Sequence, residues 1–558
     1  MNNKHTIFPS QIAFYAIWLG SLILQAIYTE LIDDEAYYWY YAQHLDWGYF
    51  DHPPVIALLI KTGTGILGNT TLGVRIMSIL LSGLTVFIWE KIIEPKLPVL
   101  YYLLVSSVAV LHFYGFVATP DAPLLFFSAL ALYFYKKFLS NNNWINAMGM
   151  GIALGLAFLS KYHAVLVAAL VLLSNIKLLR NKYFWFTVFI IILIDFRHLL
   201  WQIHHHFPSL SYHFFERSAK PYSFSFTFEY LLFLPFVFGP FTGLFIFWSN
   251  FTEQKGGKFE KGLKFIFWGG LIFFFIMSFK GRNEPHWILF TLYPGLYFTY
   301  LFLEKNIRFK RYFYYSLPLS YIIILLARIF FIFEWEHPLL KPTSDYYHNK
   351  KWIQSIHQEL GNLPVVFMNS YQKPSLYYFY TGVEAFSLNN IQGRKNQFNI
   401  WDWEDKYRGK TLAVIPNYII PVDTIPGTNG RFRYVIINNF QSYSKLWLKP
   451  LNEWKDAYYP NEEIHVKLFV ENRHSGTIDL EANKQFPVFI FYHYEQNGKV
   501  LPINKTGIRL TNKDIDSEIE CTIKLPSNAG KYQLFFDVAT GWFPPSYNSN
   551  KYNVKVFE

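Results

Sequence analysis

The run IAFYAIWLGSLILQAIY (residues 12–28) is followed, after two residues, by LIDDEAYYWYYAQHLDWGYFDHPP (residues 31–54). The first run is apolar and long enough to cross a bilayer as a helix. The second begins where the chain would leave the membrane, and it combines aromatic rings with five carboxylates: Asp33, Asp34, Glu35, Asp46 and Asp51. A loop that only joins two helices does not need these groups. We therefore expect a membrane protein with a functional surface at this exit.

The composition indicates a chain that crosses the membrane many times. Hydrophobic residues make up 52% of it and charged residues 16%, whereas soluble proteins carry about 25% charged residues. Residues 55–67 are apolar but too short to span, which predicts an interfacial or re-entrant helix. The aromatic content of 21% excludes a disordered chain, and unbroken apolar runs argue against a β-barrel. Longer apolar runs predict about 11 spans, near residues 8–28, 72–90, 97–116, 122–136, 144–159, 164–177, 183–200, 227–250, 263–279, 287–303 and 312–334.

The positive charge fixes the expected orientation. The net charge is +11, and the excess lies in short Lys/Arg tracts between alternate spans, for example residues 255–264 and 305–311. Such tracts stay in the cytoplasm, so the N-terminus is expected inside, and an odd number of spans puts residues after 335 outside. These tracts account for the net positive charge, so the charge does not indicate binding to nucleic acid. The first apolar run is interpreted as a retained anchor, and the single cysteine, Cys521, allows no internal disulfide.

Three domains follow from the change in pattern along the chain. Residues 1–335 form the transmembrane domain. Residues 342–440 mix short apolar strands with turns and a possible helix at KKWIQSIHQELG, which indicates a small α/β domain. Residues 445–558 alternate apolar and polar residues, as in EIHVKLFVEN, which predicts a β-sandwich.

The loops on the outer face carry the groups that could do chemistry. They include DDEAYYW and GYFDHPP, then TPDAPL (119–124), SKYHA (160–164) and FKGRNEPHW (279–287). A carboxylate at the surface can take a proton from a hydroxyl, and clustered cations suit a phosphate. Asp51 and His52 could also bind a divalent metal. The simpler interpretations are acids at a helix N-terminus and Asp121 as a helix cap.

With these stretches in order, residues 8–334 resemble the C-type (GT-C) glycosyltransferases. Within them the chain is similar to the bacterial relatives of protein O-mannosyltransferases and of the aminoarabinose and galacturonic acid transferases that modify lipopolysaccharide. The resemblance implies a polytopic helical membrane protein of about 11–13 transmembrane helices, followed by extracytoplasmic α/β and β-sandwich domains. It implies a sugar donor on a polyprenyl phosphate and, as acceptor, lipid A or lipopolysaccharide, another glycolipid or a protein.

The resemblance also assigns residues. Asp34 is the implied catalytic carboxylate, with Asp33 as an extra acid beside it. The family segment similar to FEKPP is FDHPP here, so Asp51 replaces the glutamate and His52 the lysine, and a metal at Asp51 (Mg²⁺, Mn²⁺ or Zn²⁺) stays an open alternative. No nucleotide cofactor is expected, because no phosphate-binding glycine loop is present. The remaining expected substrate contacts are Glu35, Tyr38, Asp121, Lys161, His163, Lys280, Arg282, Glu284 and His286.

The expected activity is inverting transfer of the sugar to an acceptor hydroxyl, at the outer face of a bacterial inner membrane with the C-terminal domains in the periplasm. A transporter or flippase of lipid-linked substrates is the main alternative, since ionisable groups also mark transport routes. It predicts polar groups at mid-span, where this chain has few. A receptor or scaffold would leave the acids and cations of the outer loops unexplained.

The expected orientation can be tested by labelling. A cysteine introduced near residue 470 should react with a membrane-impermeant maleimide in cells whose inner membrane is intact, because the sandwich lies outside the cytoplasm. Labelling that requires lysis of that membrane would show that the orientation is wrong.

Overall fold

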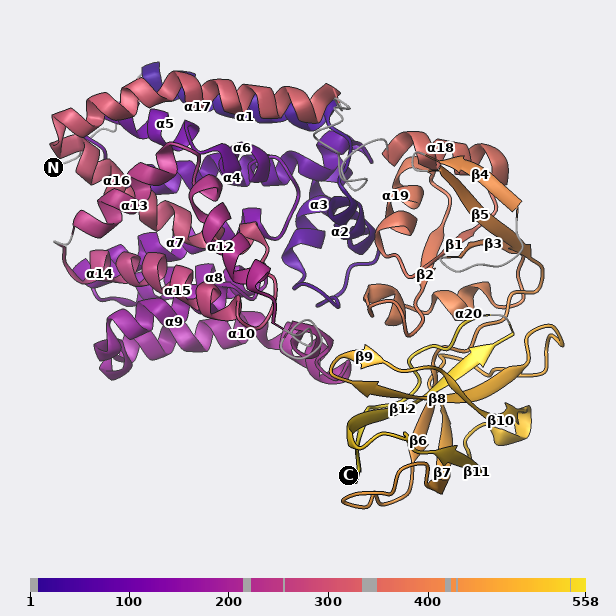
Figure 1. The fold of residues 1–558 in the computed structure, drawn as a ribbon. Helices are drawn as coiled ribbons and strands as arrows, with labels where there is room; N and C mark the ends of the chain where they lie inside the picture. Colours follow the sequence, from indigo (N-terminus) through magenta and orange to yellow (C-terminus); the bar gives the residue numbers. More distant parts are fainter. Residues whose placement is uncertain are drawn as a thin grey trace. The chain divides into compact units, whose positions relative to one another are not determined.

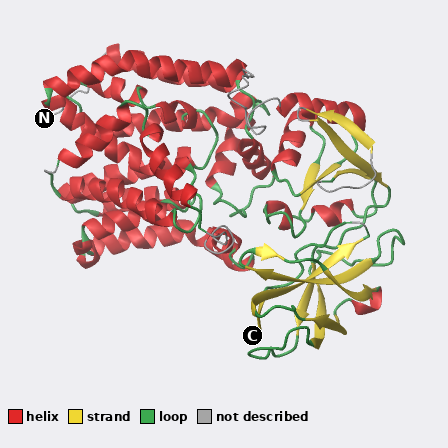
Figure 2. Cartoon of the chain, in the orientation of Figure 1, coloured by secondary structure: helices red, strands yellow, loops and turns green. Residues whose placement is uncertain are grey.

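The computed structural model describes residues 9–213, 222–253, 256–333, 349–416, 423–427, 430–541 and 543–557. Its contacts divide the chain into two compact units, Met1–Ser218 with Tyr222–Asn349, and Ala219–Pro221 with Lys350–Glu558. The first unit is helical, and the described strands all belong to the second (Figure 1, Figure 2).

The helices of the first unit are α1 (Pro9–Tyr28), α2 (Asp33–Gln43), α3 (Val55–Leu67), α4 (Thr71–Ile93), α5 (Pro98–Ser106), α6 (Ala109–Tyr114), α7 (Asp121–Ser140), α8 (Trp144–Phe158), α9 (Ala164–Ser174), α10 (Lys182–His204), α11 (Pro208–Ser211), α12 (Phe224–Val237), α13 (Thr242–Thr252), α14 (Lys258–Lys264), α15 (Gly270–Met277), α16 (Leu292–Lys305) and α17 (Ile307–Phe333). Every predicted span contains helical structure, and the predicted short helix at 55–67 is α3. The expectation of a polytopic helical membrane protein is confirmed.

Not every predicted span is one straight helix. Among the described residues, five helices are long and apolar enough to cross a bilayer, namely α1, α4, α7, α10 and α17. The predicted span 227–250 is instead the pair α12 and α13, bent by 98°. The bend lies at Gly239, whose φ of 102° is available mainly to glycine, and at Pro240, which cannot donate a helical hydrogen bond.

The second unit begins with an α/β lobe. Helix α18 (Asn349–Leu360) covers the helix expected at KKWIQSIHQELG. Strands β1 (Val365–Met368), β2 (Ala385–Leu388) and β3 (Leu412–Ile415) pair in parallel in the order β2-β1-β3. The antiparallel strands β5 (Gly430–Ile437) and β4 (Asp423–Gly427) complete the sheet. Helix α19 (Gln372–Thr381) connects β1 to β2, and α20 (Trp403–Tyr407) precedes β3.

A β-sandwich follows the α/β lobe. One sheet has the order β10-β8-β12-β13, with β9 on β8, and the other has the order β11-β7-β6. The strands are β6 (Leu446–Pro450), β7 (Glu463–Asn472), β8 (Val488–Gln496), β9 (Lys499–Val500), β10 (Asn504–Leu510), β11 (Ser517–Lys524), β12 (Gly530–Thr540) and β13 (Tyr552–Val556). Alternate residues such as Leu468, Ile490 and Phe536 fill the core between the sheets, as expected for antiparallel strands.

A histidine and an aspartate are buried on the other face of the larger sheet. His493 on β8 and Asp537 on β12 are both 0% exposed, and His493 Nε2 lies 2.6 Å from Asp537 Oδ2. Burial raises the pKa of Asp537 to about 6, although the contact with His493 and the charge of Lys395 oppose the shift. The folded protein therefore binds a proton here at a pH where the unfolded carboxyl has lost it.

This pair predicts a pH dependence of stability. The contribution of Asp537 to the free energy of unfolding should be full below about pH 4 and lost as the pH rises through about 6. Asp537→Asn should remove that dependence, so the difference between wild type and variant should change by on the order of 1–3 kcal/mol across the window. Thermal unfolding from pH 4 to 7 measures it.

Glu518→Gln, at an exposed position on β11, is the matched control and should leave the pH profile unchanged. Parallel profiles for wild type and Asp537→Asn would contradict the assignment.

Candidate functional site

A buried ion pair connects α4 with the start of α2. Arg75 and Glu35 are both 0% exposed, and Arg75 donates to both carboxylate oxygens, Nε to Oε1 at 2.8 Å and Nη2 to Oε2 at 2.5 Å. The remaining donors of Arg75 reach three carbonyl oxygens at the end of α1, those of Ala26, Thr29 and Glu30. The guanidinium thereby holds the end of α1 and the first turn of α2 in one place.

The same carboxylate reaches a second outer loop. Glu35 Oε1 accepts a hydrogen bond from the Ala118 amide at 2.8 Å, and Oε2 accepts one from Ile32 at 3.2 Å. Both oxygens are thus engaged within the protein. We therefore assign Glu35 the task of positioning the two loops, which differs from the substrate contact that the sequence predicted.

The two acids before Glu35 lie in the first turn of α2. Asp33 is 8% exposed and Asp34 is half-buried. The positive end of the helix dipole favours the carboxylate form of both side chains. Because α2 is fixed by Glu35, the position of Asp34 depends on the ion pair with Arg75.

The TPDAPL and SKYHA loops meet in a second buried ion pair. Asp121 is the first residue of α7, and Lys161 lies in the turn before α9. Lys161 Nζ donates to both oxygens of Asp121, at 2.7 and 2.8 Å, and the two residues are 2% and 4% exposed. The N-cap of α7 is Pro120, and no side-chain capping hydrogen bond is formed there, so the interpretation of Asp121 as a helix cap is wrong and its carboxylate instead pairs with a buried cation from another loop.

The GYFDHPP stretch brings an acid and a neutral imidazole beside these groups. Tyr37 and Tyr41 donate their hydroxyls to Asp51 Oδ2 at 3.1 and 3.4 Å. His52 packs edge-on against Tyr38, with ring centroids 5.3 Å apart. Burial lowers the pKa of His52 to about 3, against the charge of Asp51. At neutral pH His52 is therefore a hydrogen-bonding group, and the structure does not support it as a cation for phosphate.

The residues of the KGRNEPH loop differ in whether they pack against other side chains or lie at the surface. His286 packs on Tyr114 with ring centroids 5.5 Å apart, while His163 stacks on Phe274 at the same separation. Burial and the charge of Lys161 keep the pKa of His163 well below its usual range. Three residues of this loop, Lys280, Arg282 and Glu284, complete the predicted set.

These loop cations remain at the surface. Lys280 is exposed, and Arg282, with a side chain 63% exposed, pairs through Nε with Glu229 Oε2 at 3.3 Å. Glu284 is half-buried. The structure thus places half-buried His52 within electrostatic reach of the buried side chains of Asp51, Lys161 and Asp121, and leaves Lys280 and Arg282 at the surface.

Side chains at the end of α10 contact the first loop and hold it in place. The sequence did not predict this contact. Trp201 Nε1 donates to Asp46 Oδ2 at 2.7 Å, and His198 Nδ1 lies 2.7 Å from the Trp47 carbonyl oxygen. Gly48 lets these rings approach, since an added Cβ would lie 2.5 Å from Trp201. Arg75 was also missed, although a lone cation inside an apolar span is itself a signal of function or pairing.

The described side chains around Asp51 provide few ligands for a metal ion. In the described ranges there is no set of three or more His, Cys, Asp or Glu side chains that could hold an ion. The Asp51 oxygen that faces Tyr37 and Tyr41 is occupied by their hydroxyls. Among the described residues no third ligand joins Asp51 and His52, and a metal at Asp51 stays a prediction.

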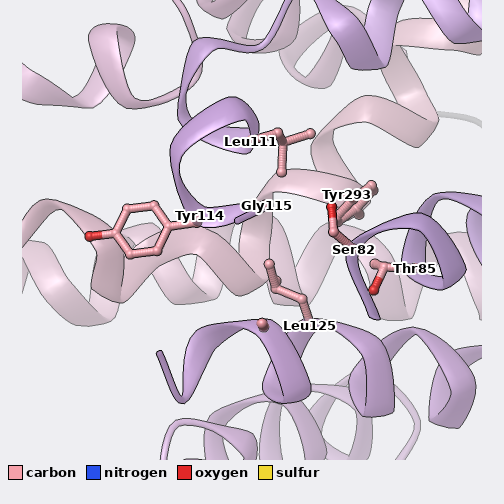
Figure 3. Close-up of a pocket in the computed structure, with 8 residues that line it drawn as sticks. Ser82, Thr85, Leu111, Tyr114, Gly115, Leu125 and Tyr293 are labelled. Atoms are coloured by element: carbon pink, nitrogen blue, oxygen red, sulfur yellow. The ribbon is translucent and has the colours of Figure 1, made fainter. Parts of the chain in front are cut away.

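A small pocket lies deeper in the helical unit (Figure 3). Its lining combines apolar residues with Ser82, Thr85, Tyr114 and Tyr293, and the hydroxyl of Tyr114 points away from it. Leu111 and Leu125 project into it from opposite sides. No charged side chain lines it, so it does not offer a site for a phosphate.

Comparisons with known proteins identify the families and folds that this chain resembles. The family model described as dolichyl-phosphate-mannose-protein mannosyltransferase matches residues 51–201, which include Asp51, Asp121 and Lys161. The lipid A galacturonosyltransferase RgtD of Rhizobium johnstonii is 31% identical over 147 residues. That match covers 25% of this chain and 30% of the relative, so it spans less than a third of the relative's length.

Solved structures match over more of the chain. ArnT from Cupriavidus metallidurans in the apo state has a TM-score of 0.57 and 14% identity, covering 77% of this chain and 97% of that one. This protein has the GT-C fold. The same ArnT bound to undecaprenyl phosphate has a TM-score of 0.53 and 13% identity, covering 77% and 98%. The resemblance that the sequence indicated is confirmed at the level of the fold.

The central ion pair can be tested by removing one partner. Arg75→Met should leave Glu35 buried and uncompensated, which costs about 3–5 kcal/mol of folding stability. Thermal unfolding of the purified GT-C protein should show a marked loss, and the double variant Arg75→Met, Glu35→Gln should recover part of it.

The control is Lys136→Met, which removes the exposed ion pair between Lys136 Nζ and Glu94 Oε1 (2.8 Å) and should cost no more than about 1 kcal/mol. If Arg75→Met unfolds at the same temperature as the wild type, the ion pair does not stabilise the two loops.

Proposed function

We propose that the protein is an inverting glycosyltransferase that moves a sugar from a polyprenyl-phosphate donor to an acceptor hydroxyl, on the outer face of a bacterial inner membrane. The observation that carries the proposal is the connection of three outer loops by buried charged contacts: Glu35 to the Ala118 amide, and Asp121 to Lys161. A membrane protein that only displayed its second unit would not need this connection.

In the proposed reaction each of these side chains has one role. Asp34 accepts the proton of the acceptor hydroxyl as general base. The hydroxyl oxygen bonds to the anomeric carbon as the bond from that carbon to the phosphate oxygen breaks, and the phosphate leaves with the electron pair. One displacement inverts the anomeric carbon. Lys161 stabilises the charge that develops on the leaving phosphate, and the rings of Tyr37 and Tyr38, both buried, help to exclude water.

The relatives support the choice of substrates. The matched curated relative is a lipid A galacturonosyltransferase, and one solved ArnT structure contains undecaprenyl phosphate. On this basis we propose a polyprenyl-phosphate-linked sugar as donor and a lipid A or lipopolysaccharide glycolipid as acceptor, ahead of another glycolipid or a protein. The second unit would then face the periplasm.

The general base is the part of the proposal that a single substitution tests. Asp34→Asn keeps the size of the side chain but removes the base, so the transfer rate should fall by about 10²–10⁴ while the donor still binds. Radiolabelled sugar transfer to an extracted glycolipid fraction measures the rate.

Asp33→Asn is the matched control. Adjacent helical residues point about 100° apart, so Asp33 and Asp34 cannot both face one hydroxyl, and Asp33→Asn should reduce the rate only mildly. Loss of transfer in Asp33→Asn alone would move the base by one residue. Normal transfer in both variants would refute a base in this loop.

A further inference from the structure

The second unit carries another group of functional side chains, at the carboxyl end of its parallel strands. Strand β1 lies between β2 and β3, and the chain passes from β1 to β2 on one side and then to β3 on the other. In open α/β sheets, ligands bind outside the carboxyl ends of strands at such a reversal. Here that end carries residues 369–371 after β1 and residues 389–397 after β2.

The segment after β2 is held rigidly by asparagines. Asn369 Oδ1 accepts from the Asn390 amide at 2.8 Å, and Asn369 Nδ2 donates to Asn390 Oδ1 at 2.8 Å. Further along, Asn389 Nδ2 donates to Asn399 Oδ1 at 2.7 Å. Gly393 packs so closely that an added Cβ would lie 2.3 Å from Asn369 Oδ1. The loop is therefore preorganised, which lowers the entropic cost of binding.

This rigid segment presents two adjacent cations against aromatic rings. The Arg394 guanidinium lies 4.4 Å from the centroid of the Tyr371 ring, and the Lys395 ammonium lies 5.0 Å from that of Tyr547. Tyr547 in turn donates its hydroxyl to the carbonyls of Ile391 and Gly393, at 2.9 and 3.0 Å. Stacking on the rings restricts the movement of both side chains and fixes the directions of their N–H groups.

The side chains at this end of the sheet offer hydrogen-bond donors and positive charge. They therefore favour a ligand with many hydrogen-bond acceptors. Asn390 is 1% exposed, and its Nδ2 donor has no hydrogen-bond partner in the described part of the chain. Lys395 also lies within electrostatic reach of Asp537, and its charge opposes the rise in the pKa of Asp537. A buried donor and a forked cation together match a phosphate.

We propose that residues 369–371 and 389–397 form a binding site for a phosphate monoester, through Arg394 with Asn390 and Lys395. The assignment of that phosphate to a sugar of the acceptor headgroup rests on the function proposed above. The second unit would then select acceptors by their phosphate, while the helical unit performs the transfer.

The test uses the purified full-length protein and glucose 1-phosphate, with binding measured by calorimetry. Wild type should bind glucose 1-phosphate and not glucose. Arg394→Gln should weaken binding by about ten- to a hundredfold. Arg394→Lys keeps the charge but loses the fork, so it should weaken binding by a smaller factor, and it covers the case in which Arg394→Gln does not fold.

Arg509→Gln, on the exposed surface of β10, makes the same change of charge and should bind like wild type. Two outcomes would overturn the site: wild type that does not bind glucose 1-phosphate, or folded Arg394 variants that bind it unchanged. Equal binding of glycerol 1-phosphate would overturn the sugar assignment and indicate a phospholipid headgroup. Because no transfer is measured, failure of the proposed reaction would not mimic any of these results.

Discussion

The ion pair between Arg75 and Glu35 is the contact on which the loops around Asp34 and Asp121 depend. It joins α4 to α2, fixes the carbonyl end of α1 and, through Glu35, reaches the Ala118 amide in the loop before Asp121. Two full charges at 0% exposure are costly to bury, and the cost is offset only because the donors of Arg75 find several acceptors. The contact therefore determines where α2 begins, and with it where Asp34 lies.

Lys161 is already engaged by a carboxylate before any substrate arrives. Lys161 is paired with Asp121, and low pKa values keep the His52 and His163 rings neutral at pH 7. A donor phosphate that enters this group would have to share Lys161 with Asp121 rather than meet an unpaired cation. In the proposed reaction this arrangement limits tight binding of the carrier phosphate, which is also the product that must leave.

The sequence predicted the helical regions well because apolar runs are strong signals, and it singled out the loops that carry Asp34, Asp121 and Lys161 because acids, histidines and isolated cations gather there between apolar runs. It did not predict the 98° bend between α12 and α13, although Gly239 and Pro240 were visible, since a propensity does not give an angle. It assigned Glu35 to the substrate because its partner, Arg75, lies 40 residues away along the chain. The hydroxyls of Tyr37 and Tyr41 on Asp51 likewise depend on packing, which no local pattern encodes.

The position of Arg75 in the chain has a consequence for how the protein is made. An arginine in an apolar helix opposes insertion by about 2.5–3.5 kcal/mol when it lies at the centre of the bilayer. Arg75, near the start of α4, finds its acceptors in α1 and α2, which are synthesised before it and end at Tyr28 and Gln43. The pair can therefore close as soon as α4 enters the membrane, while the later helices are still on the ribosome. The charge of Arg75 is thus compensated by chain that precedes it, and the Ala118 amide adds its hydrogen bond to Glu35 only when the later loop is made.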